Sequence, residues 1–169
     1  MIEQIRLVVN GSGGVGKDTF CEMLRKYTRV YKCSIIDVVK EVMIGAGLSI
    51  EKNAKTRKQM YDIKQALEKR DIPYQCVKNE LHNSQIEYEP VFWVDMREKE
   101  DIDRFAREYG AIKVLIKNDR VAPIISNPAD SSVFENGYDY IIENNGTLEN
   151  LQEEAYKFVK RIKQRMWYY

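Results

Sequence analysis

Hydrophobic residues fall into two kinds of segment that alternate along the chain. Short runs rich in β-branched and aromatic residues are typical of buried strands, whereas apolar residues three or four positions apart are typical of helices. The runs predict strands at residues 5–9, 29–36, 91–95, 111–116 and 138–142. The helical spacing predicts helices at residues 17–27, 37–45, 54–70, 73–83 and 99–109, and a final helix that Thr147 caps.

This alternation of strands and helices predicts the fold class. Successive βαβ units build a parallel sheet that helices cover on both faces. We therefore predict an α/β protein, a three-layer fold with a five-stranded parallel sheet flanked by helices. Residues 117–137 lack a periodic pattern, and loops of that length are usually functional or mobile. We interpret them as a lid-like or base-binding loop.

Length and composition narrow the class of protein. The 169 residues are 44% hydrophobic and 31% charged, which predicts one domain over residues 1–169. The net charge of +1 gives no reason to expect a nucleic acid polymer or a membrane as partner. No apolar run reaches the about 20 residues that span a bilayer, and no secretory signal is visible. Three cysteines without C-x-x-C spacing favour reduced thiols, so we expect a cytoplasmic protein, with oligomers possible.

A glycine-rich loop follows the first predicted strand and leads into the first predicted helix. It satisfies the phosphate-binding pattern G-x-x-x-x-G-K, in which glycines let backbone N–H groups point at a polyphosphate. The helix N-terminus adds a partial positive charge, and Lys17 adds a full one. A dinucleotide fingerprint fits less well because it has no use for Lys17. The candidate cofactor-binding residues are Gly11, Gly13, Gly14, Val15, Gly16, Lys17, Asp18 and Thr19.

Two carboxylates are candidate metal ligands. Asp18 stands where this loop usually has a Ser or Thr that contacts Mg²⁺, and a carboxylate oxygen also suits Mg²⁺. Asp95 ends a buried strand, and ligands of parallel sheets bind beyond the carboxyl ends of strands. The alternatives are that Asp18 is a first-turn acid favoured by the helix dipole and that Asp95 is a strand-end turn residue.

Basic residues on the helix at residues 54–70 form a candidate acceptor site. Arg57, Tyr61 and Lys64 have i, i+4, i+7 spacing, which places them on one face. Such a face can bind an acceptor phosphate, and Arg can do so with two hydrogen bonds. A solvated basic face is the alternative.

Four further residues have weaker signals. Arg97 lies two positions after Asp95 and is a candidate catalytic residue that could reach a phosphate. Ser34 and Asp37 follow the second strand and could bind a sugar or a base edge, although a capped helix start also explains them. Arg120 is a candidate substrate-binding residue in the lid-like loop. For both arginines the alternative is a surface position.

The glycine loop resembles that of nucleoside monophosphate kinases, and its Gly-Lys-Asp variant is most similar to phage-type deoxynucleoside monophosphate kinases. Animal-type phosphomevalonate kinases have a similar variant. The resemblance extends to residues 34–41, 55–64, 94–98 and 138–148. It implies the P-loop fold, an acceptor-side helical region at about residues 37–89, and the cofactors ATP and Mg²⁺.

The resemblance implies transfer of the γ-phosphoryl group of ATP to a (deoxy)nucleoside monophosphate. Lys17, Asp95 and Arg97 are then the expected catalytic residues. Two alternatives stay open: a kinase for another small phosphorylated metabolite, and an ATP-binding regulatory protein with little turnover. A GTPase is poorly supported, because residues 117–119 do not form the N-K-x-D pattern that reads guanine.

Overall fold

The secondary structure follows the predicted alternation closely. The computed structural model describes residues 4–51, 53–122 and 137–165. The strands are β1 (Ile5–Asn10), β2 (Val30–Ser34), β3 (Val91–Asp95), β4 (Ile112–Lys117) and β5 (Tyr140–Glu143). The helices are α1 (Lys17–Arg25), α2 (Asp37–Gly45), α3 (Ala54–Glu68), α4 (Ile72–Ile86), α5 (Lys99–Tyr109) and α7 (Leu148–Arg165).

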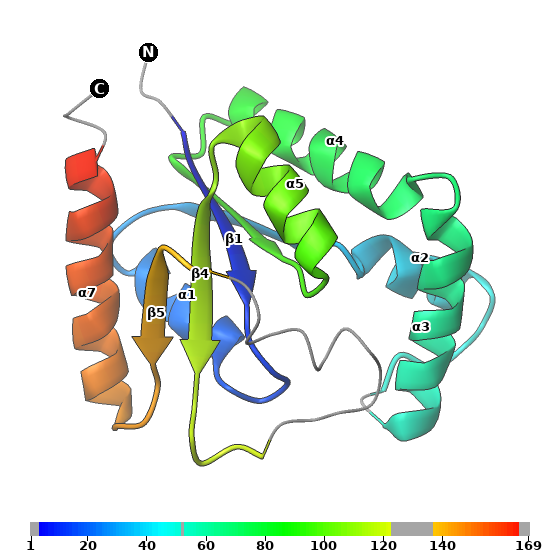
Figure 1. Ribbon diagram of the computed structural model, residues 1–169, viewed down its shortest axis with the longest axis horizontal. Coiled ribbons are helices and arrows are strands. Elements are labelled where there is room, and N and C mark those ends of the chain that lie inside the picture. Colours follow the sequence, from blue (N-terminus) through cyan, green and yellow to red (C-terminus); the bar gives the residue numbers. More distant parts are fainter. Residues whose placement is uncertain (1–3, 52, 123–136, 166–169) are drawn as a thin grey trace.

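All five strands are parallel and form one sheet in the order β2-β3-β1-β4-β5 (Figure 1). The central strand β1 pairs with β3 in a register that places Val9 beside Asp95, and with β4 in a register that places Asn10 beside Leu115. The predicted three-layer α/β fold with a five-stranded parallel sheet is therefore confirmed. Because all strands run the same way, their carboxyl ends share one edge, which lies towards the bottom of Figure 1.

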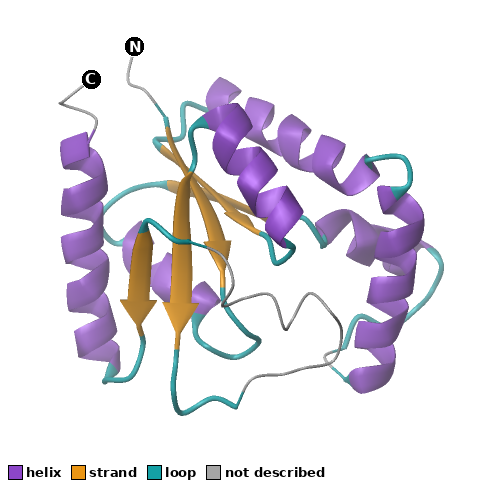
Figure 2. Ribbon diagram, viewed as in Figure 1, coloured by secondary structure: helices purple, strands orange, loops and turns teal. Residues whose placement is uncertain are grey.

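Helices cover both faces of the sheet (Figure 2), and each face carries its own hydrophobic core. On one face, Phe20 of α1 and Phe158 of α7 pack against the strands, with ring centroids 5.8 Å apart. On the other, Phe105 of α5 and Tyr74 of α4 pack over Phe92 of β3. The helices that follow β1 and β3 thus cover opposite faces, and ligands of parallel sheets bind beside such a change of direction.

Helices α2, α3 and α4 contact one another (Figure 1), and α4 joins this group to the sheet by packing against β2 and β3. Asn53 caps α3 by accepting a hydrogen bond from the N–H of Thr56 at 2.9 Å. Arg104 of α5 binds both carboxylate oxygens of Asp71 and lies 3.7 Å from the ring centre of Tyr74. These contacts fasten the turn between α3 and α4 to α5. The predicted acceptor-side region includes this group, and its role stays a prediction.

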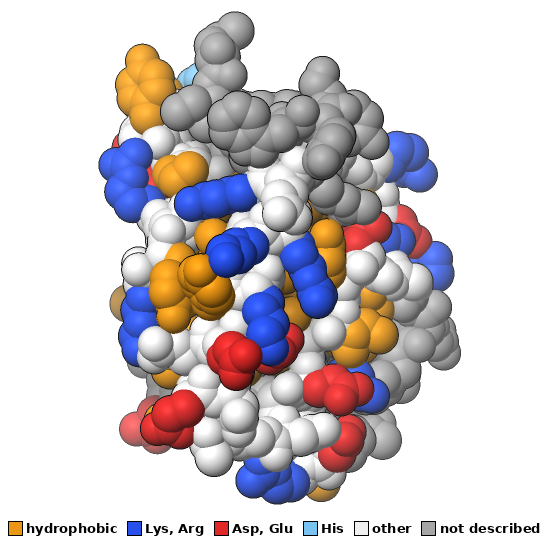
Figure 3. Space-filling view, turned by 90° about the vertical axis from the view of Figure 1, so that its left-hand side faces the viewer, with side chains coloured by type: hydrophobic (Ala, Val, Ile, Leu, Met, Phe, Trp, Pro, Cys, Tyr) orange, Lys and Arg blue, Asp and Glu red, His pale blue; other side chains and the backbone are white. Residues whose placement is uncertain are grey.

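Helix α7 covers the outer side of α1 and β5. Thr147 caps it as predicted: its hydroxyl accepts a hydrogen bond from the N–H of Asn150 at 3.3 Å. Lys and Arg side chains gather across the middle of the α7 face, and Asp and Glu side chains lie below them (Figure 3). The exposed basic residues of α7 include Lys157, Lys160, Arg161 and Lys163. Acidic residues near the helix start and basic ones further along suit the helix dipole.

The sequence predicted a lid-like loop at residues 117–137. Residues 123–136, most of the lid-like loop, lie outside the described residues. Among the helices that the structure describes, none combines the length and apolar character needed to cross a membrane.

Candidate functional site

The glycine loop between β1 and α1 has a backbone that side chains would not tolerate. Gly11, Gly14 and Gly16 have φ angles of 149°, 84° and 99°, a region that L-residues rarely adopt. A Cβ atom on Gly11 would lie 2.5 Å from the backbone oxygen of Ile116 in β4. The glycines therefore let the loop curl and approach β4 closely.

Asparagine side chains hold the curl from two sides. Asn10, buried at the end of β1, accepts a hydrogen bond from the N–H of Gly11 at 2.7 Å and donates one to the Tyr138 hydroxyl at 2.9 Å. Asn144, which follows β5, donates a hydrogen bond to the carbonyl of Val15 at 2.9 Å. The loop is thus braced against the segments on either side of β5.

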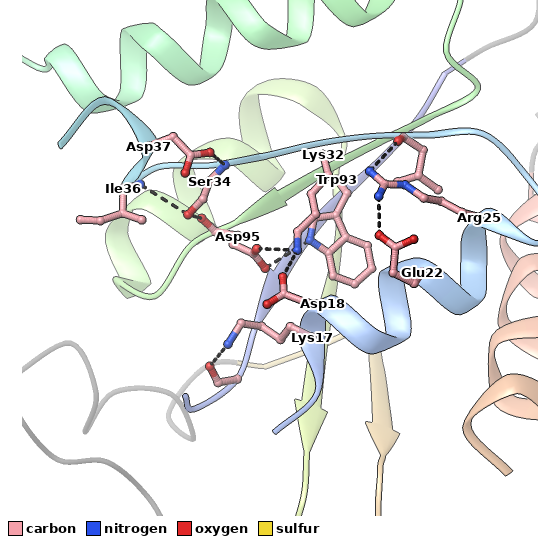
Figure 4. Close-up of polar contacts among 12 residues, drawn as sticks. Lys17, Asp18, Glu22, Arg25, Lys32, Ser34, Ile36, Asp37, Trp93 and Asp95 are labelled. Carbon is pink, nitrogen blue, oxygen red and sulfur yellow. Dashed lines mark hydrogen bonds and ion pairs between the residues drawn. The ribbon is translucent and has the colours of Figure 1, made fainter. Parts of the chain in front are cut away.

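Lys17, the first residue of α1, turns its ammonium back into the loop (Figure 4). Its Nζ donates hydrogen bonds to the carbonyl oxygens of Gly11 at 2.6 Å and Ser12 at 3.1 Å. Burial lowers the pKa of Lys17 to about 8, although the charge of Asp95 opposes this. The loop therefore holds a cation with neutral partners at a helix N-terminus, where an anion is favoured.

Beside Lys17, a second lysine links the two predicted metal ligands (Figure 4). The Nζ of Lys32 contacts a carboxylate oxygen of Asp18 and lies 3.6 Å from the Oδ2 of Asp95. The indole N–H of Trp93 donates a hydrogen bond to the Oδ1 of Asp95 at 3.2 Å. Asp18 comes from α1, Lys32 from β2 and Asp95 from β3, so three elements converge on one charge cluster.

The pKa values in this cluster reflect burial opposed by opposite charge. Burial raises the pKa of Asp95 above its ordinary value, while Lys32 and Lys17 limit the rise. Burial lowers the pKa of Lys32, but its hydrogen bond to Asp18 and the charge of Asp95 outweigh that effect and leave it raised.

The donor set fits a divalent cation. Carboxylate oxygens of Asp18 and Asp95 already share a cation, the ammonium of Lys32. In the described part of the chain, no three His, Cys, Asp or Glu side chains group into a metal cage. Mg²⁺ usually binds through one or two carboxylates together with substrate phosphates, so two carboxylates beside a candidate phosphate-binding loop are sufficient.

The structure brings several other predicted residues to the same edge of the sheet. Arg97 lies close enough to Lys17 for its charge to lower the pKa of that lysine. Ser34 donates a hydrogen bond from its hydroxyl to the Asp95 carbonyl at 3.4 Å. Asp37 accepts one from the Ser34 N–H at 2.7 Å, which is the local helix-start contact that the sequence left open.

Arg57 and Lys64 occupy different surroundings, although the sequence predicted one basic face. Arg57 is half-buried, and its guanidinium makes no ion pair within the described ranges. The side chain of Lys64 is only 5% exposed, and its Nζ lies 2.7 Å from Glu68 and 2.6 Å from Glu98. Lys64 turns towards the start of α5, where acidic residues supply its partners. A phosphate-binding role for either residue stays a prediction.

Arg120 lies beyond the end of β4, beside the turn that follows β5. Its guanidinium donates hydrogen bonds to the backbone oxygens of Asn145 and Gly146. Asn145 in turn donates to the carboxylate of Asp119 at 2.7 Å. These contacts join the ends of β4 and β5. A substrate-binding role for Arg120 stays a prediction.

Sequence reasoning missed three residues of the site. Lys32 had a detectable signal, because a charged side chain within a short buried strand is unusual. Asn10 and Asn144 had little signal, since asparagine is common where strands end in turns. Asn10 and Asn144 brace the glycine loop only because of the order of the strands in the sheet, which the sequence does not show directly.

Comparisons with known proteins show the fold. The chain matches no protein-family model and no curated protein. It is similar to a solved sugar kinase from Janibacter sp. HTCC2649, with 11% identity and a TM-score of 0.57 over 94% of this chain and 95% of that chain. It is similar to dephospho-CoA kinase from Campylobacter jejuni, with 14% identity and a TM-score of 0.55 over 94% and 97%. Shikimate kinase from Aquifex aeolicus has 18% identity and a TM-score of 0.50 over 92% and 96%.

Because Asn144 braces the loop, we expect alanine to destabilise the protein more at Gly16 than at Gly47. A Cβ on Gly16 would lie 2.4 Å from the amide nitrogen of Asn144, whereas a Cβ on Gly47 would meet nothing within 4 Å. Both glycines have positive φ. Gly47→Ala should therefore lower the free energy of unfolding by only the backbone cost of about 1 kcal/mol. Gly16→Ala should cost about 1–3 kcal/mol more, because the Asn144 hydrogen bond is also displaced. Urea denaturation measures both, and equal costs would show that Asn144 does not brace the loop.

The lowered pKa of Lys17 predicts that removing its charge stabilises the protein without ligand. Below pH 8 both folded and unfolded chains are protonated at Lys17, so folding bears the full cost of burying the charge. As pH rises from about 8 towards 10.5, the folded chain releases a proton that the unfolded chain still holds, and stability rises. Lys17→Met should be more stable than the wild type at pH 7 by about 1–3 kcal/mol.

The stability difference between the two proteins should shrink as pH rises through that window, which urea denaturation at several pH values measures. Comparing the two proteins cancels the titration of other groups. A Lys17→Met protein that is less stable than the wild type at pH 7 would contradict the prediction.

Proposed function

We propose that this chain is an ATP-dependent phosphotransferase that moves the γ-phosphoryl group of ATP to a (deoxy)nucleoside monophosphate. One observation carries the proposal: the ammonium of Lys17 lies inside the curled glycine loop, where its hydrogen-bond partners among the described residues are the carbonyl oxygens of Gly11 and Ser12. The oxygens of a polyphosphate can replace those carbonyls and place a negative charge beside the Lys17 ammonium. The similarity of the fold to that of three kinases supports the phosphotransferase class.

To catalyse phosphoryl transfer, a protein must position the two substrates and neutralise the negative charge of the phosphates. Backbone N–H groups of the loop and the N-terminus of α1 bind the β- and γ-phosphates. Lys17 follows the charge that develops on the transferred group, and Arg97 adds a second cation nearby. The acceptor phosphate attacks directly, so no covalent intermediate on the protein is needed.

Asp18 and Asp95 are the residues that would hold Mg²⁺. When bound there, Mg²⁺ supplies positive charge to the phosphate oxygens. Asp95 lies on a strand and is oriented by the Trp93 indole, so its position is fixed before nucleotide binds. Asp18 is exposed and can adjust.

Arg57 is the residue best suited to the acceptor phosphate. It lies on α3, in the group formed by helices α2, α3 and α4, and no carboxylate of the described chain neutralises it. Ser34 and Asp37 lie at the end of β2, where they could contact the sugar or the base. The resemblance of the loop to that of deoxynucleotide kinases favours a nucleotide as acceptor. The similar solved structures include a sugar kinase and a shikimate kinase, which makes a different small acceptor the second candidate.

ATP consumption with a panel of acceptors, beside an acceptor-free control, tests the proposal. Turnover that requires a nucleoside monophosphate supports it, and turnover with another phosphorylated metabolite replaces the acceptor but keeps the class. ATP binding with no turnover on any acceptor favours a regulatory protein. A protein that does not bind ATP refutes the assignment of the loop.

Lys17→Met should remove transfer while the protein stays folded. The loss should be about 10²–10³-fold in kcat, the scale for removing one preorganised charge donor. Lys26→Met is a matched control, because Lys26 lies just after the same helix and its Nζ donates a hydrogen bond to Gln152 on the surface. Steady-state kinetics of both variants test this, and Lys26→Met should keep the kcat of the wild type. Near-normal turnover in Lys17→Met would show that this loop is not the active site.

Arg57→Ala and Lys64→Ala should have different effects, because the structure gives the two side chains different partners. Arg57→Ala should raise the KM for the acceptor about tenfold or more and leave ATP affinity nearly unchanged. Lys64→Ala should mainly lower stability, by about 1–3 kcal/mol, because it leaves half-buried carboxylates without a cation. Kinetics and urea denaturation separate the effects. If Arg57→Ala weakens ATP binding instead, this part of α3 is not the acceptor site.

A further inference from the structure

Lys32 places a cation where the proposed function requires a metal ion. Its side chain reaches from β2 and is 19% exposed. The register between β2 and β3 puts Lys32 beside Trp93, and Ser34 beside Asp95. Lys32 and Asp95 therefore meet on the α1 side of the sheet, where Asp18 completes the cluster (Figure 4).

The cluster needs this cation. The side chain of Asp95 is only 18% exposed, so little water is available to stabilise its negative charge and a nearby positive charge is favoured. Asp18 and Asp95 both approach the same ammonium, so the two carboxylates lie close enough together to repel each other. The ammonium of Lys32 lies between them and offsets both the burial and the repulsion.

A lysine and a divalent cation cannot both occupy the space between the same two carboxylates. Their positive charges would repel at a few ångströms in a site of reduced dielectric constant. Lys17, the residue before Asp18, also lies beside this cluster (Figure 4). A polyphosphate gives both lysines a new anionic partner, so its arrival removes the reason for Lys32 to stay between the carboxylates.

We propose that Lys32 is a tethered counter-ion that holds Asp18 and Asp95 in the nucleotide-free protein and withdraws when Mg²⁺ and nucleotide bind together. Lys32 thereby blocks the binding of Mg²⁺ alone and couples metal binding to the arrival of the phosphates. This inference rests on the proposed function in one respect, that Asp18 and Asp95 are the Mg²⁺ ligands.

Trp93 is a built-in reporter of this exchange. Its indole nitrogen bonds Asp95, and the ammonium of Lys32 lies 5.8 Å from the centre of its ring. The chain has two tryptophans, so Trp167→Phe leaves Trp93 as the single indole. Fluorescence of this parent variant therefore reports changes beside Asp95 without any turnover.

The test is a Mg²⁺ titration of the nucleotide-free parent and of its Lys32→Met derivative, followed by Trp93 fluorescence and by melting temperature. Without Mg²⁺, Lys32→Met should melt at a lower temperature, because Asp18 and Asp95 lose their cation. It should bind Mg²⁺ alone about tenfold more tightly than the parent and regain stability as it does so. Lys157→Met is the matched control: Lys157 is also ion-paired, to Glu153 at 3.0 Å, but on the outer face of α7. It should bind Mg²⁺ as the parent does.

Two further measurements make the test decisive. Asp18→Asn added to Lys32→Met should abolish the gain in Mg²⁺ affinity, which ties the gain to this cluster. If Lys32→Met does not fold, Lys32→Gln retains a long polar side chain without the charge and replaces it. The parent alone must also change its Trp93 emission when Mg²⁺ is added to an ADP complex held in chelator. An unchanged emission there, or an equal or weaker Mg²⁺ affinity in the folded lysine variant, overturns the proposal.

The outcomes separate this inference from the proposed function. Calorimetry of the parent with ATP and Mg²⁺ measures nucleotide binding directly. A parent that does not bind ATP refutes the proposed function. A parent that binds ATP with Mg²⁺, together with a Lys32→Met variant of unaltered Mg²⁺ affinity, refutes the counter-ion role alone.

Discussion

Parallel hydrogen bonding of β1 to both of its neighbours is the constraint on which the site depends. The register that sets Val9 beside Asp95 brings the end of β3 next to the start of the glycine loop. The register with β4 brings the Ile116 carbonyl so close to Gly11 that only a glycine fits there. A slip of one residue in either pairing would separate these groups and turn each side chain to the other face.

The basic groups around the glycine loop differ in whether a carboxylate neutralises them. Lys17 bonds carbonyl oxygens, Lys32 is shared between two carboxylates, and Arg57 has no carboxylate partner within the described chain. Lys17 and Arg57 make no ion pair among the described residues, so under the proposed function they need little reorganisation when a phosphate binds. Lys64 differs from Lys17 and Arg57, because it is a buried cation paired with the carboxylates of Glu68 and Glu98. Lys17 and Arg57 are therefore available to an anion, whereas Lys32 and Lys64 are paired with carboxylates.

The elements and the phosphate loop could be predicted from the sequence because their signals are local. The β-branched run of β3 and the amphipathic pattern of α5 depend only on neighbouring residues, and both were found at their observed bounds. The roles of Lys32 and Lys64 depend on contacts across the fold. The position of Lys32 follows from the pairing of β2 with β3, which are more than fifty residues apart, and that of Lys64 from the approach of α5. Helical spacing alone placed Lys64 beside Arg57 because it takes no account of what packs above each residue.

The position of β1 at the centre of the sheet also has a consequence for the order of folding. Its partners begin at Val91 and Ile112, so its backbone groups find no sheet neighbour until most of the chain is available. Such distant pairings give a high contact order and demand a large loss of chain entropy before they yield any energy. The glycine loop cannot curl against Ile116 earlier than that. Assembly of the sheet and curling of the glycine loop are therefore coupled, because both depend on pairings between distant parts of the chain.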